Sequence, residues 1–250
     1  MTDKEKAAKY RMLWDHHTHT TYSHGKGSIL DNVKAAHDRG LQSIAITDHG
    51  PGNFCYGMKM ERIPEMRADI LEAGKVYPDV KVLLGVEANT IRRAPYLDIA
   101  DDEWDKLDIV LAGFHFAVLG SGMIPNRMGL KGRRLLAQNT DMIVNALFHA
   151  EECGHHIEIL THPGDKGPFD IREIARACEK TGTLMEINGK HPHLTAEEIR
   201  MVAPFDVRFV ISSDAHIPGN VGRFEPQLMR ALEAGLDPER IVNISVKEEM

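Results

Sequence analysis

The sequence predicts a single α/β domain folded as a distorted seven-stranded (β/α)7 barrel. Seven short runs rich in valine, isoleucine and leucine alternate with longer helical segments. The runs lack a clean polar face, which is typical of parallel strands that helices cover on both sides. No linker or change in composition divides the 250 residues. These observations favour one closed barrel over two smaller domains.

The predicted strands follow one another along almost the whole chain. They cover residues 11–17, 42–49, 80–89, 107–115, 156–163, 183–189 and 207–216. Residues 1–10 precede them as a polar lead-in without the apolar core of a secretory signal. We therefore expect the folded domain over residues 11–250.

Helical segments lie between the strands, and several have recognisable starts. Ser28 with Asp31 forms a capping-box-like pattern, which begins a helix that runs towards Gly40. Further helices are predicted over residues 59–77, 135–154, 170–182 and 225–235, with a short one opened by Thr195.

The connection GSGMIPNRMGLKGRR, residues 120–134, has a weak pattern and follows the end of the fourth strand. It carries four cationic side chains: Arg127, Lys131, Arg133 and Arg134. Two interpretations stay open: a mobile surface loop, or a basic lid over an anionic substrate.

Composition restricts the location and partners of the protein. A net charge of −7 argues against a surface that coats long nucleic acid. The three cysteines are scattered and form no C-x-x-C pair, which indicates reduced thiols. No apolar run approaches the roughly 18–20 residues of a membrane span. We expect a soluble cytoplasmic protein without a membrane partner; its oligomeric state, including a homo-oligomer, stays open.

Side chains that can bind a metal follow every predicted strand. In order, the ends carry His17 and His19 with His24 shortly after, Asp48 and His49, Glu87, His115, His162, Glu186 and Asn188, and Asp214 and His216. The C-terminal ends of barrel strands meet at one mouth. In an extended H-x-H or D-x-H segment the two ligands point to the same side. The coincidence predicts a metal site rather than a series of polar turns.

These motifs resemble the PHP domain, the polymerase and histidinol phosphatase superfamily, and within it the small stand-alone phosphatases. The resemblance covers roughly residues 11 to 246. Its motifs are DHHTHT (15–20), TDHG (47–50), GVEAN (85–89), GFH (113–115), THPG (161–164) and SDAH (213–216).

The resemblance implies a distorted seven-stranded barrel that holds a trinuclear metal centre. It implies a first ion on His17, His19, Glu87 and Asp214, a second on Glu87, His115 and His162, and a third on His24, His49 and His216. Zinc is the expected metal for so many imidazoles, and the family also uses iron and manganese.

Three residues depart from the family pattern. His24 stands where many relatives have Asp, which leaves the identity of the third metal less certain. His16 replaces a usual apolar residue and is interpreted as a packed or solvated side chain. Phe116 follows His115 where some relatives place a polar residue, which affects the substrate pocket.

The ligand charges indicate the reaction. Three divalent ions carry about +6 and the ligands Glu87 and Asp214 offset two of these charges, so the site calls for hydroxide and an anionic guest such as phosphate. A metal-bound hydroxide is then the nucleophile, with Asp214 and His216 at the reacting centre. Asp15, Asp48 and Asn188 are expected to orient the ligands.

Arg223 is a candidate phosphate clamp, with a surface ion pair as the alternative. Arg127 and Lys131 are candidate substrate contacts in the basic connection. Asp165 and Lys166 border the mouth without an assigned role. His191 and His193, in KHPH after the sixth strand, are interpreted as loop residues rather than ligands.

The first hypothesis is therefore a phosphomonoesterase acting on a small phosphorylated metabolite, with histidinol phosphate as one option. A phosphodiesterase or 3′–5′ exonuclease acting on short nucleotides is the alternative within enzymes. A non-catalytic, metal-stabilised module is the alternative outside them. A C–N hydrolase is more remote, because Lys190 lacks the context of a metal-bridging lysine.

Overall fold

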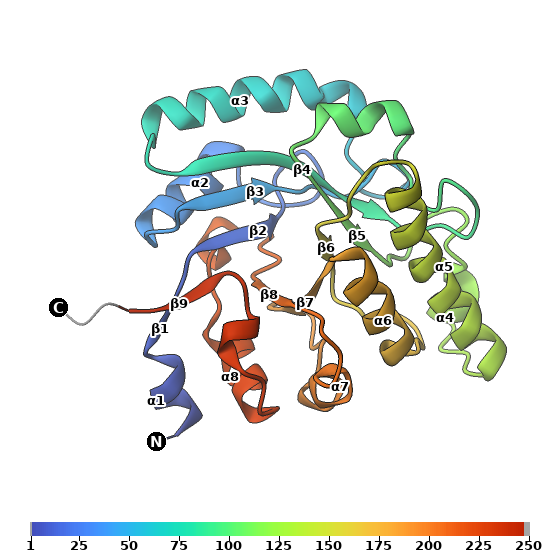
Figure 1. Cartoon of the computed structure of the whole chain (residues 1–250). Coiled ribbons are helices and arrows are strands. Elements are labelled where there is room, and N and C mark those ends of the chain that lie inside the picture. Colours follow the sequence, from blue (N-terminus) through green and yellow to red (C-terminus); the bar gives the residue numbers. More distant parts are fainter. Residues whose placement is uncertain (1, 248–250) are drawn as a thin grey trace.

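The computed structural model describes residues 2–247 and contains a seven-stranded parallel sheet that curls into a nearly closed barrel (Figure 1). The strands are neighbours in chain order. They are β2 (Trp14–Thr18), β3 (Ser43–Ile46), β4 (Lys81–Asn89), β5 (Ile109–Gly113), β6 (Ile159–Leu160), β7 (Leu184–Asn188) and β8 (Phe209–Ser212). The prediction of an α/β barrel with seven strands is confirmed.

Helices cover the outside of this sheet (Figure 1). They are α2 (Ile29–Asp38), α3 (Ile63–Val76), α4 (Met123–Arg127), α5 (Arg133–Glu152), α6 (Ile171–Thr181), α7 (Ala196–Val202) and α8 (Glu225–Glu233). Short 3₁₀ helices occur at η1 (Met60–Arg62), η2 (Asp101–Lys106), η3 (Pro218–Asn220) and η4 (Pro238–Arg240). Ser28, Asp170 and Thr195 cap α2, α6 and α7 through their side chains, as predicted.

Alternation along the strands separates two apolar layers. On β4, Leu84 and Val86 belong to the core between sheet and helices, whereas Leu83 packs against the smaller cluster inside the barrel. Gly85 has no side chain, and a Cβ there would lie 2.5 Å from Ile109. Apolar side chains fill one end of the barrel interior, so Glu87, two residues on, faces the other end, where the polar strand ends meet.

The seam between β2 and β8 joins the first and last strands. Thr18 and Ala215 form a parallel bridge, and the His19 N–H donates to the Ala215 carbonyl at 2.9 Å. The side-chain amide of Asn243 donates to the carbonyls of Trp14 (2.8 Å) and Ile211 (2.7 Å). These contacts bring segments some 200 positions apart in sequence to one mouth.

The N-terminal region differs from the prediction. Residues 11–17 do not form one strand: β1 (Tyr10–Met12) pairs antiparallel with β9 (Ile244–Val246), and only β2 enters the barrel. The polar lead-in folds as helix α1 (Asp3–Ala7), which contacts α8 and buries Ala7. The lead-in is therefore a packed part of the fold.

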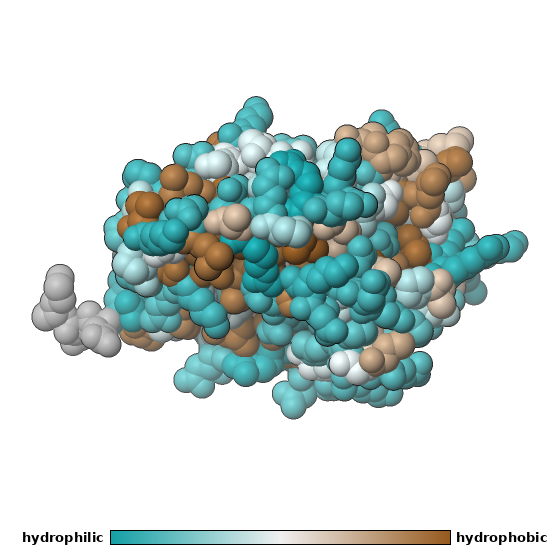
Figure 2. Space-filling model, turned by 90° about the horizontal axis from the view of Figure 1, so that it is seen from above, coloured by the Kyte–Doolittle hydropathy of each residue, from teal (hydrophilic) through white to brown (hydrophobic). Residues whose placement is uncertain are grey.

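The basic connection 120–134 is partly helical, since it contains α4 and the first two residues of α5. Its cationic side chains are exposed. Seen from above, the molecular surface is mostly hydrophilic with interspersed apolar atoms (Figure 2). Among residues 2–247, no helix has both the length and the apolar character needed to cross a membrane.

Candidate metal centre

The polar strand ends converge into four overlapping groups of candidate ligands, each with its ligand atoms within 4.8 Å of one another. The groups are His17/His19/Asp214, His19/His49/His216, His49/Glu87/His115 and His162/His191/Asp214. They contain eight of the nine ligands predicted from the sequence and one residue, His191, that was interpreted as a loop residue. The ninth predicted ligand, His24, belongs to none of these groups.

The first group has distances suited to one ion. His17 Nε2 lies 3.1 Å from His19 Nε2 and 3.4 Å from Glu87 Oε1, and His19 Nε2 lies 3.3 Å from Asp214 Oδ1. Metal–ligand bonds of about 2.0–2.1 Å in a tetrahedron place the ligand atoms roughly 3.4 Å apart. These four side chains therefore fit the first ion that the family resemblance implies.

Glu87 is the hub of the cluster and is fully buried. Its Oε1 lies 3.2 Å from His115 Nε2 and 3.0 Å from His162 Nε2, and its Oε2 lies 2.9 Å from His49 Nδ1. Burial raises the pKa of Glu87, but the nearby imidazoles, His115 first, outweigh burial and hold that pKa well below its usual value. The buried carboxylate is thus an anion that can bridge cations.

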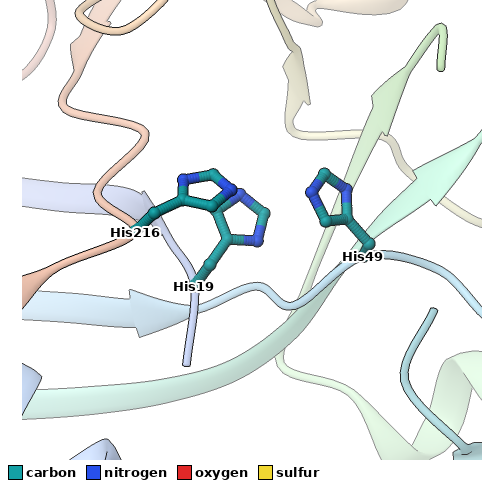
Figure 3. A group of neighbouring side chains, drawn as sticks. All are labelled: His19, His49 and His216. Carbon is teal, nitrogen blue, oxygen red and sulfur yellow. The ribbon is translucent and has the colours of Figure 1, made fainter. Parts of the chain in front are cut away.

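Three rings from separate segments form the next group (Figure 3). The ring centre of His19 lies 4.3 Å from that of His49 and 4.2 Å from that of His216. His24 is near them, with its ring 4.3 Å from the His216 ring, but its side chain is exposed. In this arrangement His19 rather than His24 completes the group with His49 and His216.

Unpaired buried atoms support the presence of bound cations. In the described part of the chain, His19 Nδ1 is buried without a hydrogen-bond partner. His49 Nδ1, Glu87 Oε2 and His115 Nε2 are buried too, and their contacts at 2.9 and 3.2 Å lack the geometry of a hydrogen bond. Buried polar atoms are normally hydrogen-bonded. Imidazole nitrogens and a carboxylate oxygen are ordinary ligands of divalent transition metals, so the residues present fit such ions.

A buried glutamate orients the first histidine. His17 Nδ1 lies 2.7 Å from Glu186 Oε1, while Glu186 Oε2 accepts hydrogen bonds from the His162 N–H (2.7 Å) and Asn188 Nδ2 (2.8 Å). Asn188 Nδ2 also lies 3.2 Å from Asp214 Oδ2. Carboxylates that hold the second ring nitrogen fix the tautomer of a ligand histidine. The predicted orienting role of Asn188 agrees with these contacts, and Glu186 shares that role.

A second network holds His115. Asp98 accepts hydrogen bonds from the Gly52 N–H (2.7 Å) and from the backbone and side-chain amides of Asn89 (2.6 and 2.5 Å). Burial raises the pKa of Asp98 to about 6, so the group is a carboxylate at pH 7. The Asn89 amide must therefore turn its NH₂ to Asp98 and its oxygen to His115 Nδ1, 2.8 Å away. His115 then carries its proton on Nδ1, which leaves Nε2 as a ligand atom.

The aspartates predicted to orient imidazoles have another role, and the prediction needs correction. Asp15 accepts hydrogen bonds from the backbone N–H groups of Ser213 (3.2 Å) and Gly222 (2.8 Å). Asp48 accepts from the Thr20 N–H at 2.8 Å and from the Thr20 hydroxyl. Both carboxylates hold the backbone of ligand-bearing segments rather than an imidazole ring. Sequence spacing could not separate these two roles, because both place the carboxylate beside a ligand.

A cleft opens at the cluster, and a second cleft, which includes none of the candidate ligands, is lined by residues that follow His115 and His162 in the chain. One, of about 400 Å³, is lined by Asp214 and His216 together with Lys26, Lys190 and Arg223, and Lys190 Nζ lies 3.0 Å from His216 Nε2. The other, of about 480 Å³, is lined by Phe116, Asn126, Gly129, Leu130, Lys131, Lys166, Gly167 and Pro168. Arg127 lines neither of the two clefts.

Sequence reasoning missed His191 and Lys190 as groups at the mouth. Both follow β7 directly, and their backbone N–H groups donate to Asn188 Oδ1 at 2.7 and 2.8 Å. The available signal was their position just beyond a strand end, the same signal that marked the other ligands.

Known proteins are similar to this chain in sequence and in fold. A model of the PHP domain matches residues 15–190. A protein of Caldanaerobacter subterraneus named a probable phosphatase is 29% identical over 253 residues, covering 95% of this chain and 89% of its own. A probable phosphatase of Acetivibrio thermocellus is also 29% identical, covering 95% of this chain and 93% of its own.

Two solved structures share the fold at 15% sequence identity. The histidinol phosphate phosphatase of Lactococcus lactis, solved with zinc, L-histidinol and phosphate, has a TM-score of 0.59 and covers 90% of this chain and 95% of its own. A Listeria monocytogenes protein that is named as a histidinol phosphatase has a TM-score of 0.61 and covers 84% of this chain and 97% of its own. The family match spans most of the barrel and every ligand-bearing motif up to β7. The chain therefore belongs to the PHP domain family.

Proposed function

We propose that this PHP-domain protein is a metal-dependent phosphatase that hydrolyses a phosphate monoester of a small metabolite. The observation that carries the proposal is the cluster of imidazoles around two buried carboxylates, Glu87 and Asp214. The relatives named probable phosphatases support the reaction class. The solved structure of the Lactococcus lactis histidinol phosphate phosphatase contains L-histidinol and phosphate, into which histidinol phosphate is hydrolysed. Histidinol phosphate is therefore a reasonable first substrate to test on this protein.

The candidate ligands can be assigned to the three ions of the proposed trinuclear centre. His17, His19, Glu87 and Asp214 would hold a first ion. His115 and His162, together with Glu87, would hold a second. His49 and His216 would hold a third, with His24 beside them. When bound, such ions acidify a water into a nucleophile and neutralise the phosphoryl oxygens. The metal in this proposal is zinc, with iron or manganese as alternatives.

In this proposal the phosphate group of the substrate binds in one cleft and the leaving group in the other. Lys26, Lys190 and Arg223 place three cations in the cleft beside His216, where they can bind phosphate oxygens. Phe116 and Lys131 line the second cleft, which offers an apolar face and a charge to a leaving group. Asp214 and His216 line the first cleft and are the residues closest to the reacting phosphate in this proposal.

The presence of two clefts also favours a second candidate. A phosphodiester, such as a short nucleotide, would place one substituent in each cleft. A monoester leaves one cleft to its single substituent and the other to the phosphate. The substrate preference therefore has to be measured on both ester types.

The decisive experiment uses the full chain purified without chelators. Metal content is determined by elemental analysis, and the same sample is assayed with p-nitrophenyl phosphate, bis-p-nitrophenyl phosphate and histidinol phosphate. We expect about three divalent ions per chain and monoester turnover that a chelator abolishes. Turnover of bis-p-nitrophenyl phosphate alone would show that the protein is a phosphodiesterase and not a phosphatase. Bound metal with no turnover of any ester would indicate a non-catalytic, metal-stabilised module.

A further inference from the structure

We propose that His191 is a metal ligand of this centre, contributed by the loop after β7. This inference rests on the proposed metal centre, although not on the identity of the substrate. His191 is outside the nine-residue ligand set that the family resemblance implies. The structure nevertheless groups its ligand atom with those of His162 and Asp214, two members of that set.

The orientation of the ring supports a ligand. His191 Nε2 lies 3.6 Å from Asp214 Oδ2, close to the separation of two ligands on one ion. On the other side of the ring, Nδ1 lies 3.1 Å from Asp165 Oδ2, which also lies 2.7 Å from Lys166 Nζ and makes no hydrogen bond in the described residues. A metal-binding histidine usually has a carboxylate near its second ring nitrogen, and Asp165 lies close enough to take that place.

Asp214 connects His191 to the rest of the centre. Its Oδ1 faces His19 Nε2 at 3.3 Å, whereas its Oδ2 faces His191. His162 makes the second connection, because its Nε2 lies 3.0 Å from Glu87 Oε1 and its ring centre 4.9 Å from that of His191. The ion held by His162 has only three protein ligands in the family set, so His191 supplies a fourth.

The loop is built to hold this position. Asn188 Oδ1 accepts the His191 N–H at 2.7 Å, and the Asn188 N–H donates to the His193 carbonyl at 2.9 Å. His193, two residues on, turns its Nδ1 to Glu198 at 3.0 Å instead. The same short loop thus presents one histidine to the centre and one to helix α7, which provides a matched control.

The test compares the zinc affinity of the wild-type protein with that of His191→Ala, Asp165→Asn and His193→Ala. Affinity is measured by competition with a chromogenic chelator, and coordination by the visible spectrum of the Co²⁺-substituted protein. In His191→Ala we expect the zinc affinity of at least one site to fall more than about 100-fold and the Co²⁺ spectrum to change. In Asp165→Asn we expect the zinc affinity to fall about 10- to 100-fold. His193→Ala should match the wild type.

Wild-type zinc affinity and an unchanged Co²⁺ spectrum in His191→Ala would overturn the proposal. Equal losses in His191→Ala and His193→Ala would also overturn it, because they would indicate a disturbed loop rather than a lost ligand. His191 is partly exposed, and circular dichroism confirms that each variant is folded. A wild-type protein that binds zinc but cleaves no phosphate ester would refute the proposed phosphatase and leave the result for His191 valid.

Discussion

The inner wall of the barrel mouth and its rim differ in how their side chains are held. On the inner wall, His17, His19, Glu87 and His115 are at most 2% exposed and each has a close polar neighbour within the cluster. On the rim, the side chains are exposed or half-buried and come from loops or, in the 120–134 connection, partly from helices α4 and α5. These side chains are His24, Lys190, His191, Arg223 and the cationic residues of the 120–134 connection. In the proposed enzyme, the inner wall would hold the metal ions and the rim would contact the substrate.

The largest expected effect comes from the hub of the inner wall. Glu87→Gln removes the anion that the first and second proposed ions would share, so we expect loss of bound metal and a fall in phosphatase activity of more than about 100-fold. Metal per chain and p-nitrophenyl phosphate turnover are measured on the same sample. Glu151→Gln, on the surface of α5, is the matched control. Full metal content in Glu87→Gln would remove Glu87 from the ligand set.

A second inner-wall variant tests the network behind His115. Asp98→Asn places an amide opposite the Asn89 NH₂, so Asn89 is driven to turn its own NH₂ towards His115 Nδ1. His115 would then carry its proton on Nε2, and the ligand atom would be lost. We expect metal affinity about 10- to 100-fold lower.

Two measurements test the predicted tautomer and affinity. Nitrogen NMR of the metal-free protein reports the tautomer of His115, and chelator competition reports the affinity. Asp101→Asn, an exposed aspartate three residues on, serves as the control. An Nδ1-protonated His115 in Asp98→Asn would show that Asp98 does not set the tautomer.

This difference between wall and rim explains what the sequence could predict. Strand alternation fixes the direction of a side chain, so His17, Glu87 and Asp214 could be assigned to one mouth from their positions at strand ends. Asp98 could not be found in this way, because it lies in the irregular segment after β4 and acts through Asn89. His24 and His191 show the limit most clearly: each lies in a loop, whose path the alternation of strands does not determine.

The rim should affect binding rather than metal content. Lys190→Ala and Arg223→Ala each remove a cation from the cleft beside His216, and we expect KM to rise about 10-fold, the loss of one hydrogen bond to a charged group. Arg127→Ala is the matched control, since Arg127 is exposed and lines neither cleft. Lys131→Ala probes the second cleft. An equal rise in KM for Arg127→Ala would favour the basic connection as a lid.

The smallest effect is expected at His16, which is the neighbour of a predicted ligand but points elsewhere. Its ring stacks on Trp14 with centres 4.0 Å apart, and its Nε2 lies 2.8 Å from the Ser43 hydroxyl. Burial, with a smaller contribution from Lys81, lowers the pKa of His16 to about 3. The unfolded chain protonates this histidine near pH 6.5, whereas the folded chain does not. Stability is therefore retained above pH 6.5 and is lost as the pH falls from 6.5 towards 3.

At pH 5 this linkage costs about 1–2 kcal/mol in the free energy of unfolding. His16→Gln cannot titrate, so its stability should fall less than that of the wild type between pH 7 and pH 5. Urea unfolding at both pH values measures the difference, and comparing the two pH values within each protein cancels the loss of ring stacking. Bound metal and turnover should remain at wild-type levels. A wild-type pH response in His16→Gln would show that His16 keeps an ordinary pKa in the folded protein, and a loss of metal would place His16 with the ligands of the inner wall.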